Sequence, residues 1–222
     1  METIHRSKSE LQKSQQLLYE TITIMGITIL LSIIFEEWKG LITLIPAVYF
    51  FIERRFRKRA WTDIGFNFKS TLLDLKNNWL LVVLVAVVTQ VLTLLTATYF
   101  FPAYIQHVLS RIPFESSVHL VPIIFLLAAT FMEELIFRAF FQERLSWFIN
   151  GTVAIGIASL VFALMHFSKG TFSIVTFDIV TIFIDSIIYG FIYHRTKNIF
   201  ASWIPPFLAD LIGITLMMAL FS

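Results

Sequence analysis

Cysteine is absent from the 222-residue chain, which excludes disulfide bonds and zinc sites built on cysteine ligands. Charged residues are scarce as well, at 14% of the sequence, whereas a typical soluble domain has about 25%. No internal repeat or low-complexity linker divides the chain. Hydrophobic residues are abundant instead, at 57%. This composition predicts a protein whose main partner is the lipid bilayer, with no nucleic acid as a partner, and it does not indicate an oligomeric state.

Several apolar stretches approach the length of about 20 residues that a transmembrane helix needs. The sequence therefore predicts an all-α fold, a polytopic transmembrane bundle of about seven spans. We expect them at residues 17–35, 41–52, 79–101, 118–146, 152–167, 172–193 and 199–221. Residues 1–222 would form a single membrane domain, with a cytoplasmic N-terminal segment (1–16) and a basic cytoplasmic or interfacial loop (53–78).

Lysine and arginine predict the orientation, because they collect on the cytoplasmic side of membrane proteins. With a cytoplasmic N-terminus, 13 of the 17 basic residues lie in inner segments, three lie in outer segments, and Arg138 is intramembrane. The outer three are Lys39, Arg111 and Lys169. We therefore expect a multi-pass protein of the cell membrane with its N-terminus in the cytoplasm and its C-terminus outside.

Three charged residues stand close together in the fourth expected span. Glu134 and Arg138 are four residues apart with the glutamate first, which is the favourable order for an ion pair on a helix. We interpret this pair as structural. Glu133 points about 100° away from Glu134 on a helix of 3.6 residues per turn, so it lacks that partner. Because an unpaired carboxylate at membrane depth is costly, Glu133 is a candidate for chemistry.

Two further ionisable residues are expected at a similar depth. His166 ends the fifth span, four residues after Phe162, so the two rings share a helix face. Asp210 lies in the seventh span. At 1.5 Å per residue, Glu133, His166 and Asp210 each lie roughly 17–21 Å from the inner end of their helix. Histidine is the natural proton carrier near neutral pH, although a lone histidine on an apolar helix more often has a packing role.

Other polar or helix-breaking residues allow structural interpretations. Asp178 and Asp185, seven apart in the sixth span, are expected either to make hydrogen bonds between helices or to line a polar cavity. Pro205 and Pro206 are expected to break or kink the last span.

Three blocks of sequence resemble the CPBP family, the CAAX proteases and bacteriocin-processing proteins, also called the abortive-infection family of intramembrane proteases. The blocks are Glu-Glu-x-x-x-Arg at 133–138, Phe-x-x-x-His at 162–166, and the start of the last span at 196–202. The resemblance covers roughly residues 114–220, a protease-like core. It implies that Glu133 and His166 activate water for peptide hydrolysis, with Glu134 and Arg138 as scaffold.

The third block departs from the family pattern, which usually has His-x-x-x-Asn there. Pro206 stands at the position of the histidine and Asp210 at that of the asparagine. If those side chains hold the oxyanion, this chain lacks donors, because proline has none and an ionised aspartate only accepts. A protonated Asp210 would restore one donor.

Metal dependence stays open at this point, because the family is named both as metalloproteases and as metal-independent glutamate proteases. Glu133 and His166 would be the ligands of a divalent metal such as zinc. Catalytic zinc usually takes three protein ligands, and Asp210 is a possible third.

The leading hypothesis is therefore an intramembrane endopeptidase of CPBP type that hydrolyses a peptide or a membrane-anchored protein segment. Glu133 would be the general base, His166 its acid/base partner, and Asp210 a possible donor or ligand. The alternative is a non-proteolytic family member that acts by binding, as a bacteriocin-immunity or regulatory protein. A proton-coupled transporter is the third option, and the absence of repeat symmetry speaks against it.

Overall fold

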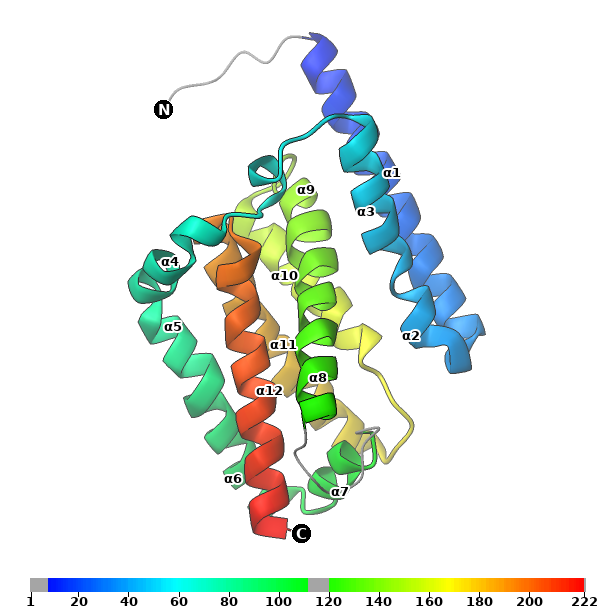
Figure 1. Cartoon of the computed structure of the whole chain (residues 1–222). Helices are drawn as coiled ribbons and strands as arrows, with labels where there is room; N and C mark the ends of the chain where they lie inside the picture. Colours follow the sequence, from blue (N-terminus) through cyan, green and yellow to red (C-terminus); the bar gives the residue numbers. More distant parts are fainter. Residues whose placement is uncertain (1–7, 112–119, 222) are drawn as a thin grey trace.

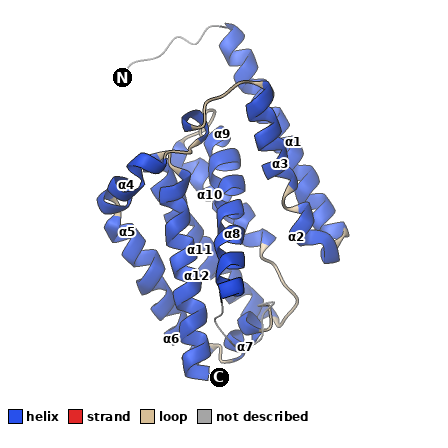
Figure 2. Cartoon of the chain, in the orientation of Figure 1, coloured by secondary structure: helices blue, strands red, loops and turns tan. Residues whose placement is uncertain are grey.

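The computed structural model describes residues 8–111 and 120–221. Within these ranges the chain is entirely helical, and no strand is present (Figure 2). Arg6, and the expected start of the fourth span at 118, lie outside the described residues. The elements in chain order are α1 (Lys8–Ile34), η1 (Glu36–Trp38), α2 (Lys39–Ile42), α3 (Ile45–Phe56), η2 (Thr62–Ile64), η3 (Phe68–Ser70), α4 (Thr71–Asn77), α5 (Trp79–Val83), η4 (Leu84–Val88), α6 (Thr89–Phe100), α7 (Ala103–Leu109), α8 (Leu120–Glu134), η5 (Leu135–Gln142), α9 (Glu143–Leu145), α10 (Gly151–Met165), α11 (Phe172–Thr196) and α12 (Ile199–Phe221).

Five helical stretches of the described chain are long and apolar enough to cross a membrane: Ser14–Ile34, Trp79–Phe100, Leu120–Leu145, Phe172–Thr196 and Ile199–Leu220. The other two expected spans correspond to shorter helices, α3 with 12 residues and α10 with 15. At 1.5 Å per residue α10 is about 22 Å long, less than the roughly 30 Å of a hydrocarbon core. The all-helical prediction is confirmed, and five of the seven expected spans meet the length criterion.

The helices form an elongated bundle in which α12 lies between α6 and α8, and the described chain ends at the opposite end from the start of α1 (Figure 1). The hairpin of α1 and α3 lies to one side of this bundle (Figure 1). A buried ion pair joins it to the core, because the Arg144 guanidinium lies 2.8 Å from Glu53 and donates to the Thr21 hydroxyl at 3.0 Å. Arg144 is 1% exposed and Glu53 4%. Both were expected in cytoplasmic segments, and the structure buries both where the hairpin meets the core.

The polar segment expected at the interface folds against the α11–α12 turn. Asn198 is fully buried, and its amide donates to Asn67 O and to Asp74 Oδ2, both at 2.8 Å. The Ile199 N–H donates to the Gly65 carbonyl at 2.8 Å. These bonds explain why the third sequence block is polar at its start: Asn198 fastens segment 62–77 to the first turn of α12.

The last span corrects one prediction. Pro205 and Pro206 lie inside α12, which continues as one helix from Ile199 to Phe221. A proline in a helix interior removes one backbone hydrogen bond and strains the preceding turn. The helix continues because both prolines are buried where α12 packs on its neighbours, and because the Trp203 indole N–H donates to Leu127 O at 3.0 Å and to Thr130 Oγ1 at 3.1 Å on α8. The expected break is therefore wrong, and the kink that was its alternative stays a prediction.

Candidate active site

The scaffold of the site is the ion pair between Glu134 and Arg138. Arg138 Nε lies 3.3 Å from Glu134 Oε1, and both side chains are buried. Arg138 also donates to the Ser186 hydroxyl on α11 at 3.0 Å, and its guanidinium lies 5.2 Å from the Phe162 ring on α10. The predicted ion pair is confirmed, and it joins three helices inside the bundle.

The helix that carries this pair changes its geometry directly after Glu134. Segment η5 is π-helical, so that the Glu143 N–H donates to the carbonyl of Arg138, five residues earlier. Helix η5 is buried along its whole length, and its last residue, Gln142, donates to Gly190 O at 2.9 Å. A Cβ at Gly190 would lie 2.8 Å from both Gln142 and Ile155, so glycine allows α10, α11 and η5 to approach here. π-Helical segments inside α-helices are frequent at functional sites, and the sequence predicted only a continuous α-helix.

Glu133 and His166 lie close together next to the Glu134–Arg138 pair. Glu133 Oε1 lies 3.6 Å from His166 Nε2, and the side chains are 37% and 32% exposed respectively. Glu133 is the last residue but one of α8, and His166 caps the C-terminus of α10. The predicted proximity of the two side chains is confirmed, and both are partly accessible; their catalytic role stays a prediction.

The orientation of the imidazole is fixed by a second contact. His166 Nδ1 lies 2.9 Å from the Phe162 carbonyl oxygen. A carbonyl can only accept, so Nδ1 must carry the proton of the neutral ring. The Phe162 ring also packs on the imidazole, with 4.5 Å between centroids, as the shared helix face predicted. Nε2, with its lone pair, therefore faces Glu133.

Asp210, on α12, is exposed and interacts electrostatically with both Glu133 and His166. The three residues thus belong to one neighbourhood. Among the described residues, however, no three His, Cys, Asp or Glu side chains come close enough together to hold a metal ion. Metal dependence therefore stays a prediction, with Glu133 and His166 as the possible ligands.

Asp178 and Asp185 have the structural contacts that the sequence allowed. Asp178 is 2% exposed and lies 2.8 Å from Arg111 Nη1. Asp185 accepts a hydrogen bond from Gln90 Nε2 at 2.8 Å, which connects α11 to α6.

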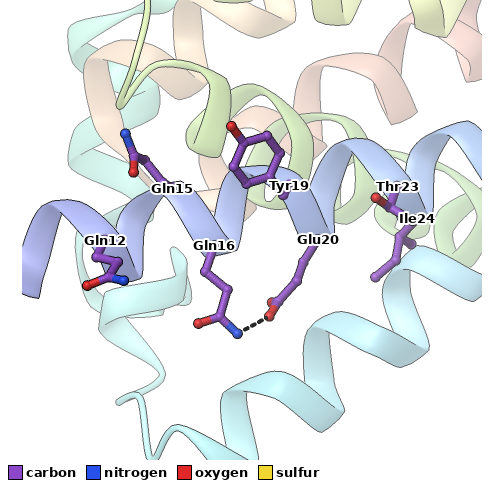
Figure 3. A pocket seen from close by; sticks show the side chains of 7 residues that line it. All are labelled: Gln12, Gln15, Gln16, Tyr19, Glu20, Thr23 and Ile24. Carbon is purple, nitrogen blue, oxygen red and sulfur yellow. Dashed lines mark hydrogen bonds between the residues drawn. The ribbon is translucent and has the colours of Figure 1, made fainter.

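Two surface grooves lie away from this site. The larger, about 600 Å³, runs along α1 and is lined by Gln12, Gln15, Gln16, Tyr19, Glu20, Thr23 and Ile24 (Figure 3). Within it Gln16 donates to Glu20 at 2.9 Å, and Glu20 is also bound by Arg57 and by the Tyr49 hydroxyl from α3. The smaller groove is formed by four residues of α3. Neither groove contains any of the residues predicted to be functional.

Residues 115–212 match the family model of the Rce1-like type II CAAX prenyl endopeptidases. We refer to residues 115–212 as the Rce1-like segment. The predicted resemblance to the CAAX proteases is thereby confirmed, and the Rce1-like segment contains Glu133, Glu134, Arg138, His166 and Asp210. No curated protein matches the chain, and no solved structure does.

The sequence did not reveal the neighbours that hold these side chains. Ser186, Tyr189 and Gly190 on α11 surround Arg138 and Gln142, and Trp203 fastens α12 to α8. Tyr189 lies 5.9 Å from the Arg138 guanidinium by its ring centroid and is 5% exposed. None of them belongs to a local motif, and each makes its contact with another helix.

Proposed function

We propose that the chain is an intramembrane endopeptidase of CAAX-protease type, which hydrolyses a peptide or a membrane-anchored protein segment. The observation that carries this proposal is the Glu133–His166 pair, 3.6 Å apart and partly accessible where α8 and α10 of an apolar bundle end. The Rce1-like segment supports the same class of reaction. Charged groups at membrane depth are costly, and an accessible pair needs a functional reason.

In the proposed mechanism Glu133 is the general base. The 3.6 Å between Oε1 and Nε2 is too long for a direct hydrogen bond, and we propose that the attacking water lies beside both atoms and donates to Glu133. Glu133 takes a proton from this water as the water oxygen attacks the scissile carbonyl carbon. The Glu133–His166 pair then delivers a proton to the leaving nitrogen as the C–N bond breaks. The bond from Nδ1 to Phe162 O holds the imidazole in the orientation that this transfer requires.

The developing oxyanion needs donors, and the third sequence block offers few. Pro206 is buried in α12 and has neither a side-chain donor nor an N–H. Asp210, four residues later on the same helix, is the remaining polar group there, and we propose that its protonated form donates to the oxyanion. A single such donor is worth about 10²–10³ in rate, so we expect a slow enzyme.

The same substitution favours a second candidate, a binding protein with an immunity or regulatory role. Such a protein retains the family fold without needing an oxyanion donor. It would not, however, require an accessible acid/base pair beside a buried ion pair. The peptidase therefore remains the function that the site supports best.

We propose that α3 and α10 also cross the membrane, which gives seven spans, a cytoplasmic N-terminus and an exterior C-terminus. The chain runs the same way along α8–α9 and along α11 (Figure 1), so it must return along α10 between them. The 13 inner basic residues of the sequence support this orientation.

The decisive experiment is a cleavage assay with purified protein in proteoliposomes. The probe is an internally quenched prenylated peptide ending in a CAAX sequence, the class named by the matching family, with the unprenylated peptide beside it. We expect Glu133→Gln and His166→Ala to lower turnover by about 10²–10⁴-fold at unchanged protein abundance. The control is Glu37→Gln, which changes a carboxylate in η1, a segment without buried residues. Full turnover in Glu133→Gln would end the proposal.

A further inference from the structure

The loop after α10, residues 167–171, directly follows His166. Side chains in and just after α7 contact this loop, and one of them is bound in turn by α11. Arg111, just beyond α7, donates from Nη1 to the His166 carbonyl at 3.5 Å and to the Ser168 hydroxyl at 3.4 Å. Asp178 on α11 holds the same guanidinium, with contacts of 2.8 Å to Nη1 and 3.1 Å from Nη2 to Oδ1. One arginine therefore connects the backbone of His166 to a buried carboxylate.

A second side chain of α7 closes on the same loop. His107 Nε2 lies 3.0 Å from the Ser168 hydroxyl, and a Cβ at Gly170 would approach the His107 ring to 3.0 Å. The absence of a side chain at Gly170 thus allows the backbone of the loop to pack closely against the His107 ring. Ser168, His107 and Asp178 are not a nucleophilic triad, because Asp178 approaches the same ring nitrogen as Ser168, at 4.0 Å.

Helix α7, which positions these side chains, is itself packed against α11 and α12. Tyr104 and Ile105 are buried in an apolar cluster with Ile174 on α11 and Met217 on α12. The Tyr104 ring packs edge-on against Phe177, one residue before Asp178, with 4.9 Å between centroids. Arg111 and Asp178 therefore project from two elements that are packed against each other.

The opposite side of the loop is held by exposed contacts. Lys169 lies 2.7 Å from Glu36, but the two side chains are 83% and 61% exposed. Exposed pairs of this kind contribute little to stability. The Arg111 side chain is 31% exposed, but its partner Asp178 is buried, whereas both partners of the Lys169–Glu36 contact are exposed. The two contacts act on neighbouring residues of one loop, so they form a matched pair for experiment.

We propose that Arg111 and Asp178 are positioning residues, which fix His166 against Glu133 by holding the loop that His166 begins. The inference rests on the proposed endopeptidase function for its catalytic consequence. The Phe162 bond orients the ring of His166, and the Arg111–Asp178 pair fixes the backbone from which that ring extends. Displacements of about 1 Å in such groups can cost about 10² in rate.

The test uses Asp178→Asn, which keeps the shape of the side chain and removes the charge that holds Arg111. The double variant Arg111→Gln with Asp178→Asn is measured beside it. Because the double variant removes both charges of the pair, it leaves neither of them unpaired and controls for misfolding caused by an unpaired charge. The control is Lys169→Gln, which breaks the exposed contact of the same loop. Turnover of the prenylated peptide is measured as kcat and KM at equal protein abundance. We expect kcat to fall at least about tenfold in both test variants, with KM unchanged and with no effect in the control, and we expect Asp178→Glu to restore part of the loss.

A second readout does not depend on activity. Because the chain has no cysteine, a nitroxide attached at Phe167→Cys labels the loop alone, and Phe167 is 60% exposed. The label should become more mobile in both test variants and not in Lys169→Gln. Unchanged mobility in Asp178→Asn and in the double variant would overturn the inference, as would a loosened loop with unchanged kcat. If the unmodified protein cleaves no peptide, the proposed function fails, and label mobility still decides whether the pair holds the loop.

Discussion

Glu133 and Glu134 are adjacent in the sequence and lie in opposite environments. Glu134 is 2% exposed and paired with Arg138, whereas Glu133 is 37% exposed and lies 3.6 Å from His166. One helix turn thus carries a carboxylate neutralised inside the bundle and another left accessible. This difference follows from the angle of about 100° between successive residues on a helix.

We expect Glu134→Gln and Glu133→Gln to fail in different ways. Glu134→Gln leaves Arg138 buried without a counter-charge, and breaking a buried pair costs about 3–5 kcal/mol. The variant should accumulate poorly in membranes and unfold at lower temperature. Glu133→Gln should accumulate like the unmodified protein and lose only activity. Membrane abundance by immunoblot and unfolding temperature in detergent check this, and equal loss of abundance in both variants would mean that Glu133 is structural as well.

At the scale of elements, the sequence predicted what is local. The Glu134–Arg138 pair and the contact between Phe162 and His166 are both spaced by four residues on one helix, and both are present. The π-helical turn of η5 was not predictable, because it depends on packing against α10 and α11. The contacts of Arg111 were not predictable either, since its partners lie 55 to 67 residues away. Apolar periodicity predicts where a helix lies but not which face meets which neighbour.

The short length of α10 has a direct consequence for the site. Its 15 residues extend over about 22 Å, less than the roughly 30 Å of a hydrocarbon core. His166 therefore caps a helix whose C-terminus lies near Glu133, the last residue but one of α8. A longer α10 would carry the histidine to the membrane surface, away from the carboxylate.

Helix α12 offers a test of the missing donor. Pro206 and Asp210 are four residues apart and share a helix face. Pro206→His introduces a donor next to Asp210, and we expect turnover to stay constant or to rise, by up to about 10²-fold. Pro206→Ala is the control, because it restores the N–H of residue 206 without adding a side-chain donor. Cleavage of the quenched peptide is compared at equal abundance. A larger gain in Pro206→Ala than in Pro206→His would assign the effect to the backbone of α12.

At the scale of the whole molecule, the helices on either side of α10 constrain the topology. Chain direction is the same along α8–α9 and along α11 (Figure 1), and these stretches are both long enough to cross a membrane. Two parallel crossings in succession require a return between them, and only α10 connects their ends. By the same reasoning, α3 would be the return crossing that follows α1 at the N-terminal end. We therefore expect more crossings than the five helices that meet the length criterion.

Cysteine accessibility tests this topology, again because the chain has no cysteine of its own. Single cysteines at Lys58 and Ile149 should be protected from a membrane-impermeant maleimide in intact cells, and one at Lys169 should react, because Lys169 is 83% exposed beyond the end of α10. A reporter fused after Ser222 should be exterior. The expectation follows from the excess of basic residues in the inner segments, 13 against three, and from α10 crossing between Ile149 and Lys169. A permeant maleimide is the control for each position, since it should label all three. Equal labelling of Ile149 and Lys169 by the impermeant reagent would show that α10 does not cross, and would also remove the argument that places His166 at membrane depth.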